Sequence, residues 1–226
     1  MSEPLILSVE TATMAGSVAI ARGRELLGVV SGDPKVSHSN TLLADIDKLL
    51  AETRISLADV DVFAVTTGPG SFTGLRIGIA TIKALSATLD RPSIGIPTLE
   101  AVALSGGVSE NSVALLPAGR GEVFTQSFSV TGESTVTPLD EAAHIPPARL
   151  IEKYDQLETV TWCGEGAIVH RQLIEEHASG KNWRIAPSDP TLATHVAKLA
   201  LSKTQFDDAY SLRAIYVRPA DAQLKT

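Results

Sequence analysis

The sequence is poor in cysteine, in aromatic residues and in long apolar runs. Its 226 residues include a single cysteine, Cys163, so no disulfide can form within the chain. Aromatic residues make up 4% of the chain and hydrophobic residues 44%, which predicts a core of Val, Ile, Leu and Ala around buried sheets. No segment reaches the roughly 20 apolar residues of a membrane span, and the first ten residues lack the basic start of a signal peptide. We therefore expect a cytoplasmic protein with no membrane partner.

Positive charge is also scarce. The chain has 19 Lys and Arg against 26 Asp and Glu, which gives a formal net charge of -7 and a pI near 5.2. Proteins that bind nucleic acid directly neutralise its phosphates with clustered Lys and Arg. We therefore expect this chain to reach RNA only through a partner.

Short β-branched runs alternate with amphipathic segments along the first hundred residues. The predicted strands are 5–11, 16–21, 26–30, 62–67 and 93–96, and the predicted helices are 39–52 and 75–89. The second half repeats this β-β-β-α-β-α-β order more loosely. Its predicted strands are 112–117, 122–130, 134–139, 159–164 and 183–186, and its helices are 148–154 and 167–177, followed by a last helix at 190–203.

Two such units predict an α/β fold made of two ribonuclease-H-like lobes, as in the actin, hexokinase and Hsp70 (ASKHA) superfamily. We expect the first lobe over 1–104, with 190–226 packing back on it, and the second over 105–189. Proteins of this fold hold a nucleotide between the lobes, with acidic residues at the ends of the first strands. Fold by itself does not give function.

Glu10 ends the first predicted strand, and Thr11 and Thr13 follow it. Two interpretations stay open: these groups hold a phosphate or metal, or they satisfy one another at a strand end. The corresponding place in the second half holds Pro117 and no acid, whereas a hard cation needs several oxygen ligands. Glu10, Thr11 and Thr13 are the candidate cofactor-binding residues, and no metal site is expected.

The stretch "GPGSFTGLRIG", residues 68–78, looks at first like a phosphate-binding loop. It carries the first two glycines of the pattern G-x-G-x-x-G, but Thr73 stands where the third belongs, and no Gly-Lys-Ser/Thr follows. Because a strand precedes it and a helix follows, we expect a tight turn in which Ser71 or Thr73 caps the helix. The start of that helix would offer at most a weak anion site.

The sequence contains no assembled catalytic or metal-binding motif. His38 begins the first helix, but the position four residues on, where a second metal ligand would share its face, is Leu42. The other histidines, at 144, 170, 177 and 195, have no ligand spacing and are expected at the surface or as caps. Cys163 lies in an apolar strand and is expected in the core, and "GRGEVF" is expected to be a hairpin turn. No nucleophile elbow is present, so we expect no catalysis by this chain alone.

Several segments together resemble, in order and spacing, the bacterial TsaB family, also called YeaZ. They are "LSVETATMAGSVAI", "HSNTLLADIDKLL", "TTGPGSFTGLRIGIATIKAL", "IGIPTLEAVA", "GRGEVF" and the tail "AIYVRP". The resemblance implies a non-catalytic paralogue of TsaD, which joins TsaD and the ATPase TsaE to make threonylcarbamoyladenosine in tRNA. It also implies that tRNA is reached only through the complex.

Three positions bear on what this resemblance implies. TsaD-type proteins carry a His-x-x-x-His metal pair where this chain has His38 and Leu42, so the metal is expected to be lost. Glu10 replaces an Asp of many relatives, and Pro117 replaces a common Asp. The chain alone is therefore not expected to bind a cofactor, and ATP or ADP would bind at the complex. The alternative is an independent ATP-dependent kinase or a glycoprotease-type metallopeptidase of the same fold, which the residues at 42 and 117 disfavour.

Helix 75–89 is predicted to be apolar on two sides. A bulky face carries Leu75, Ile79, Ile82, Leu85 and Leu89, and a face with small residues lies opposite. If the bulky face lies on the sheet, the small face needs cover from the first helix or from another molecule. TsaB relatives pair through the helices of this lobe, which implies a homodimer for the free chain. The expected partner-binding residues are Gly74, Arg76, Ile77, Ala80, Lys83, Ala84 and Ala87.

Overall fold

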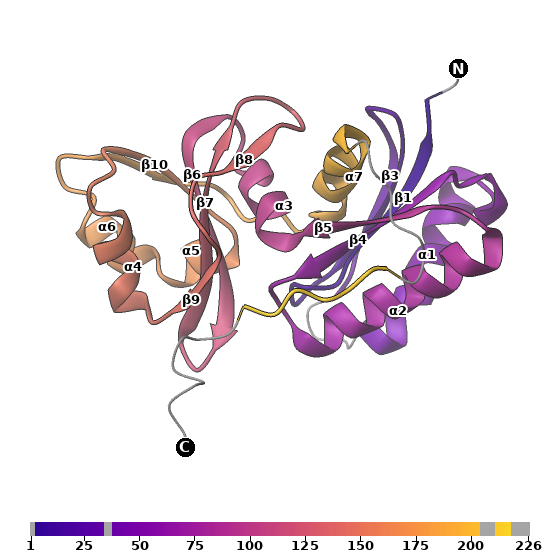
Figure 1. The fold of residues 1–226 in the computed structure, drawn as a ribbon, viewed down its shortest axis with the longest axis horizontal. Coiled ribbons are helices and arrows are strands. Elements are labelled where there is room, and N and C mark those ends of the chain that lie inside the picture. The colour runs from indigo at the N-terminus through magenta and orange to yellow at the C-terminus, as the bar shows by residue number, and fades with distance from the viewer. Residues whose placement is uncertain (1–2, 34–37, 204–210, 218–226) are drawn as a thin grey trace. The chain divides into compact units, whose positions relative to one another are not determined.

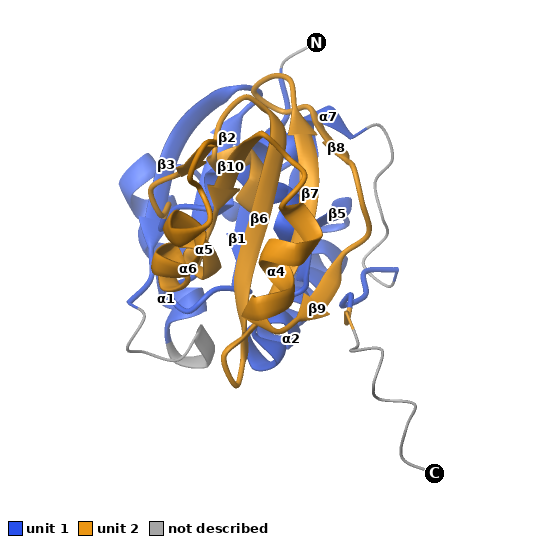
Figure 2. Cartoon of the chain, turned by 90° about the vertical axis from the view of Figure 1, so that its left-hand side faces the viewer, with its two compact units in different colours: residues 1–101, 190–215 blue, residues 102–189, 216–226 orange. Residues whose placement is uncertain are grey.

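The computed structural model describes residues 3–33, 38–203 and 211–217. Contacts divide the chain into two compact units, residues 1–101 with 190–215 and residues 102–189 with 216–226 (Figure 2). Of the segment expected to pack back on the first lobe, the described residues 190–203 and 211–215 belong to unit 1.

Unit 1 contains one five-stranded sheet in the order β3-β2-β1-β4-β5. Its strands are β1 (Leu5–Glu10), β2 (Ser17–Arg22), β3 (Glu25–Ser31), β4 (Val62–Gly68) and β5 (Ser93–Pro97). β1, β2 and β3 are antiparallel neighbours, whereas β1, β4 and β5 run parallel. β1 and β4 are buried along their whole length, which explains why they read as continuous β-branched runs without alternation.

Helices cover both faces of this sheet. Figure 1 shows α1 (His38–Thr53) and α2 (Phe72–Leu89) on one side and α7 (Ala193–Ser202) on the other. The bulky side chains of α2 join the core, as the periodicity predicts: Leu75, Ile79 and Ile82 are buried. α1 contributes Leu42, Ile46 and Leu49 to the same core. The predicted order of strands and helices in this half is confirmed, and α2 begins three residues earlier than expected.

Two short elements of this half were not predicted. α3 (Thr98–Ser105) follows β5, and a single turn of 3-10 helix at Leu57–Asp59 is capped by Ser56. The sequence does not indicate α3 because the apolar residues of this helix do not form a stripe along one face. Residues 101–104 are all buried, so the buried apolar positions are not confined to one side of the helix.

Serine side chains attach α7 to the sheet of unit 1. The Ala193 N–H donates to Ser17 Oγ at 3.0 Å, and the Ser8 hydroxyl donates to the Ala193 carbonyl at 2.7 Å. Leu192 stands at the N-cap of α7 and makes no side-chain cap. Ser17 therefore satisfies one of the N–H groups that the start of a helix leaves without a partner, from a strand 176 residues away in sequence.

Unit 2 contains a six-stranded sheet. Its strands are β6 (Ser109–Gly119), β7 (Glu122–Val130), β8 (Val136–Pro138), β9 (Ala143–Ile145), β10 (Thr159–Cys163) and β11 (Asn182–Ile185), and its helices are α4 (Pro147–Tyr154), α5 (Glu165–Val169) and α6 (Arg171–Glu176). The sheet order is β11-β10-β6-β7-β8, with β9 pairing to β7. The single helix predicted at 167–177 is wrong. The chain leaves helical geometry at His170 (φ -102°, ψ 21°), which separates α5 from α6.

An aromatic cluster forms the centre of unit 2. Trp162 is fully buried, and its ring lies edge-on to Tyr154 and to Trp183, with centroids 5.8 Å and 5.1 Å away. Such tilted pairs are favoured by the charge distribution of aromatic rings. This core thus holds both tryptophans and Tyr154, whereas the core of unit 1 is aliphatic except for Phe63.

No helix of the described residues is both long and apolar enough to cross a membrane.

The close approach of α2 to the residue after β1 generates the first prediction. A Cβ at Gly78 would overlap the Thr11 hydroxyl oxygen, which is buried without a hydrogen-bond partner among the described residues. Gly78→Ala should therefore lower the free energy of unfolding by about 1–3 kcal/mol, although alanine is the better helix former.

Removing the overlapping atom should reverse this loss. Thr11→Ala alone should change stability little, since its hydroxyl has no partner to lose, and Thr11→Ala with Gly78→Ala should recover most of the stability. Chemical denaturation followed by circular dichroism measures all three variants. Equal losses for Gly78→Ala with and without Thr11→Ala would contradict the prediction.

Candidate functional site

Glu10 lies at the carboxyl end of β1, and its carboxylate points back to its own loop. Oε1 accepts the N–H groups of Ala12 at 2.5 Å and Thr13 at 2.8 Å, and Oε2 accepts the Thr13 hydroxyl at 2.7 Å. The residue is 1% exposed. Of the two interpretations left open by the sequence, these contacts support the strand end that satisfies itself. Thr13 belongs to the same arrangement because it donates to Glu10, whereas the Thr11 hydroxyl faces Gly78 and has no hydrogen-bond partner among the described residues.

The loop between β4 and α2 is tied to this strand end. The Ser71 N–H donates to the Ala12 carbonyl at 2.8 Å, and the Gly68 N–H donates to the Thr98 hydroxyl at 3.1 Å. The Ser71 hydroxyl accepts the Gly74 N–H at 3.2 Å, so Ser71 is the N-cap of α2. These N–H groups point at protein oxygens, whereas a phosphate loop would aim them at a ligand. The predicted tight turn and the cap at Ser71 are confirmed.

The outward face of α2 lacks cover within the part of the chain that the structure describes. Ala80, Ala84 and Ala87 are exposed, together with Arg76. Ile77 and Lys83 are half-buried, and Ile77 packs against the core of unit 1. Gly74 is buried and serves the N-cap, so it does not belong to this face. We call the exposed residues Arg76, Ala80, Ala84 and Ala87, with Lys83 at their edge, the alanine face.

The exposed side of α1 carries charges of both signs, whereas α2 carries only cations. The exposed side of α1 carries Asp47, Lys48 and Glu52, together with Leu43, which is 63% exposed. The alanine face carries only the cations Arg76 and Lys83, and the Arg76 guanidinium lies 3.8 Å from the centre of the Phe72 ring. Phe72 itself is 52% exposed. The α1 and α2 surface thus combines a small-residue face, two large exposed apolar side chains and separated charges.

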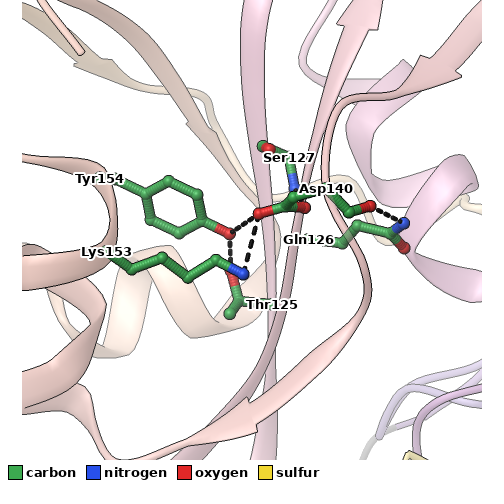
Figure 3. A network of polar contacts seen from close by, with 6 residues as sticks. All are labelled: Thr125, Gln126, Ser127, Asp140, Lys153 and Tyr154. Atoms are coloured by element: carbon green, nitrogen blue, oxygen red, sulfur yellow. Dashed lines mark hydrogen bonds and ion pairs between the residues drawn. The ribbon is translucent and has the colours of Figure 1, made fainter. Parts of the chain in front are cut away.

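A polar network in unit 2 was not found from the sequence (Figure 3). The Asp140 carboxylate accepts from Lys153 Nζ at 2.8 Å, the Tyr154 hydroxyl at 3.1 Å and the Ser127 N–H at 2.7 Å. The Tyr154 hydroxyl also lies 3.2 Å from the Thr125 hydroxyl, and burial raises the pKa of the phenol above its usual range. A buried phenol of raised pKa stays protonated at neutral pH, and its oxygen is already hydrogen-bonded, so the network serves to hold α4 and the segment before β9 against β7.

The cysteine, the histidines and the "GRGEVF" segment make contacts that belong to the fold. Cys163 is buried, and burial raises the pKa of its thiol to about 12, so the reactive thiolate is scarce at neutral pH. "GRGEVF" forms the β6–β7 hairpin, as predicted. His170 and His177 stand at helix ends, whereas His144 is half-buried, with Nε2 2.8 Å from Glu122 Oε2. His195 lies half-buried in α7.

His38 begins α1, as predicted, and Leu42 is buried four residues later. The described residues contain no group of three or more His, Cys, Asp and Glu suited to a metal ion. The expectation that the chain binds no metal stays a prediction.

The topology and these contacts define the class of protein. A mixed sheet ordered β3-β2-β1-β4-β5 with helices on both faces occurs in unit 1, and unit 2 contains a related sheet, ordered β11-β10-β6-β7-β8. The chain is thus an α/β protein of the ASKHA type with two ribonuclease-H-like units.

Comparisons with known proteins agree with this fold. The family model of TsaD, tRNA N6-adenosine threonylcarbamoyltransferase, matches residues 14–213. The Bacillus subtilis tRNA threonylcarbamoyladenosine biosynthesis protein TsaB is 25% identical over 97% of this chain and 96% of its own length. The Escherichia coli TsaB is 30% identical over 67% of each chain. The structure of YeaZ from Pseudomonas aeruginosa superposes with a TM-score of 0.77 and 22% identity, covering 94% of this chain and 99% of that one.

The chain belongs to the TsaB (YeaZ) family, within the wider group of proteins that the TsaD model describes. The predicted family and fold class are confirmed.

The contacts of Glu10 generate the second prediction. Glu10→Ala leaves the buried N–H groups of Ala12 and Thr13 without their acceptor, and should lower the free energy of unfolding by about 3 kcal/mol. Glu10→Gln keeps a carbonyl oxygen for both N–H groups, and its amide can donate to the Thr13 hydroxyl, so it should cost only about 1 kcal/mol. Thermal and chemical denaturation measure both. Equal losses would show that the fold depends on the negative charge instead.

Proposed function

We propose that this chain is a non-catalytic subunit that binds TsaD and, with TsaE, supports threonylcarbamoyl transfer to adenosine of tRNA. The observation that carries the proposal is the alanine face of α2. Family membership supports a role in the biosynthesis of threonylcarbamoyladenosine in tRNA, and the partners TsaD and TsaE are part of the proposal. The free chain is proposed to pair with a second copy through the same surface.

The physical case for docking at this face rests on its small residues. Alanine side chains let the backbone of a second helix approach closely, so that many weak contacts form over a short length of helix. Ala80, Ala84 and Ala87 recur every three or four residues and lie on one side of α2. They are exposed, whereas Leu75, Ile79 and Ile82 of the same helix are buried. A face of this kind fits another helix better than it fits a nucleotide or RNA.

Charge placement supports pairing of like surfaces. Arg76 and Lys83 lie on α2, and α1 carries the acids Asp47 and Glu52, of which Glu52 lies 4.0 Å from Lys48 on the same helix. In a two-fold symmetric pair the same patch of each copy meets the other, so acids of one α1 can face cations of the other α2. A TsaD molecule, which belongs to the same wider group, would meet this surface with the corresponding helices of its own fold.

The proposed absence of catalysis rests on the strand end described above. The Glu10 carboxylate is engaged by three donors of its own loop, and Leu42 stands where TsaD-type proteins carry the second histidine of a metal pair. We propose that the chain alone binds no cofactor and that ATP or ADP binds at the complex. The chain is further proposed to act in the cytoplasm and to contact tRNA only through its partners.

Ala84→Arg tests the docking face. A long charged side chain at this exposed position should prevent close approach of another helix, and should abolish both self-association and TsaD binding while leaving a folded monomer. Size-exclusion chromatography, pull-down with TsaD and circular dichroism measure the three properties. Gln172→Arg, which adds the same charge to an exposed helical position of unit 2, is the matched control. Undisturbed pairing by the Ala84→Arg chain would refute the proposal.

Reconstitution tests the proposed role. With TsaD, TsaE, threonylcarbamoyl-adenylate and tRNA present, addition of this chain should raise the yield of modified adenosine, and the Ala84→Arg chain should not. Product formed equally well without the chain would contradict the role as a required subunit. ATP hydrolysis by the isolated chain that Glu10→Ala abolishes would instead favour an independent enzyme.

A further inference from the structure

The last described segment of the chain, residues 211–217, runs in extended conformation (yellow in Figure 1). Its part in unit 1, Ser211–Ile215, alternates between inward and outward side chains. Leu212 is 2% exposed and belongs to the core of unit 1, and Ala214 packs against the same core. Arg213 and Ile215 are exposed. We call residues 211–215 the strap.

The strap contacts the carboxyl end of β4 and the middle of β5. The Ile215 N–H donates to the Thr67 carbonyl at 2.7 Å. Two glycines lie beneath it: a Cβ at Gly68 would overlap the Ile215 carbonyl oxygen, and a Cβ at Gly95 would overlap Thr67 Cγ2 and lie 3.2 Å from Leu212 Cδ2. Side chains at these two positions would therefore interfere with the strap, so the seat on β4 and β5 requires small residues.

The same seat holds the start of α2. Gly68 begins the loop that leads into the helix, and a Cβ there would lie 3.2 Å from Leu75 Cδ1, in the first turn of α2. The strap, the Gly68 backbone and Leu75 thus form a continuous series of contacts. Movement of the strap away from β4 would remove the support on one side of the loop that sets where α2 begins.

We infer that the strap is a positioning element for the alanine face, and that its seated state is the state that binds a partner helix. This inference rests on the proposed function. Close packing of small residues tolerates little displacement, so a helix whose first turn is free to shift loses contacts along its length. Binding and seating are then linked. If seating of the strap raises the affinity for a partner by some factor, the bound partner shifts the strap toward its seated state by that same factor.

Trypsin cleavage after Arg213 reports how often the strap leaves its seat, because a protease needs the segment detached and exposed. When the strap moves faster than the protease cuts, the cleavage rate follows the population of the unseated state. Intact-mass spectrometry separates this cut from cuts at other Lys and Arg residues. Saturating TsaD should slow it in the unaltered chain.

Three variants of the full-length chain test the inference. Leu212→Ala removes most of the side chain that packs in the core of unit 1, and Ile215→Pro removes the N–H that donates to the Thr67 carbonyl. Each should raise the cleavage rate after Arg213 at least about tenfold and weaken TsaD binding by the factor by which the seated fraction of the chain falls. Ile215→Ala keeps the N–H and trims an outward side chain, so it should change neither quantity. If Leu212→Ala lowers the stability of unit 1 in circular dichroism, Ile215→Pro decides the result.

The outcomes separate the inference from the proposed function. Cleavage that saturating TsaD does not slow would overturn the link between strap and docking face, because a partner that binds the seated state must lower the unseated population, and so would unchanged cleavage in both strap variants. Weaker TsaD binding by the Ile215→Ala chain would also overturn it, because the strap would then act by direct contact. Ala84→Arg should abolish binding while leaving cleavage at the unaltered rate. Failure of Ala84→Arg to affect binding would refute the docking face, whatever the strap variants do.

Discussion

The close approach between α2 and the loop after β1 is the constraint on which the rest of unit 1 depends. At Gly78 the helix backbone comes against the Thr11 side chain, and at Gly70 a Cβ would meet the backbone of Ala12. The Ser71 N–H then bonds the Ala12 carbonyl. These contacts join the loops that follow the paired strands β1 and β4, and they set the distance between α2 and the sheet. They therefore also determine the direction in which the alanine face of α2 points.

This constraint also explains why a glycine-rich loop stands where a phosphate site would be expected. The glycines serve close backbone packing, and the N–H groups of Gly68, Ser71 and Gly74 bond to protein oxygens. Glu10, the acid at the neighbouring strand end, is likewise used to hold its own loop. Groups that bind ligands in other proteins of this fold class thus contribute here to the support of a helix.

The sequence predicted well those features that depend on residues close together in the chain. Buried strands such as β1 and β4 were evident from β-branched runs, and the Ser71 cap lies three residues from the N–H that it accepts. The polar network around Asp140 could not be predicted, because its partners come from residues 13–14 positions away on either side and from different elements. The contact of Gly78 with Thr11 joins residues 67 positions apart, and no periodicity indicates it. The break at His170 depends on backbone angles that residue types alone do not determine.

The aromatic core of unit 2 has a consequence for how the protein can be observed. Both tryptophans of the chain, Trp162 and Trp183, lie in that cluster, 5.1 Å apart between ring centres, and unit 1 contains none. Intrinsic fluorescence excited at the indole band therefore monitors only one half of the molecule. Unfolding of the half that bears the alanine face can leave this emission unchanged, and a difference between the fluorescence and far-ultraviolet transitions would separate the stabilities of the two units.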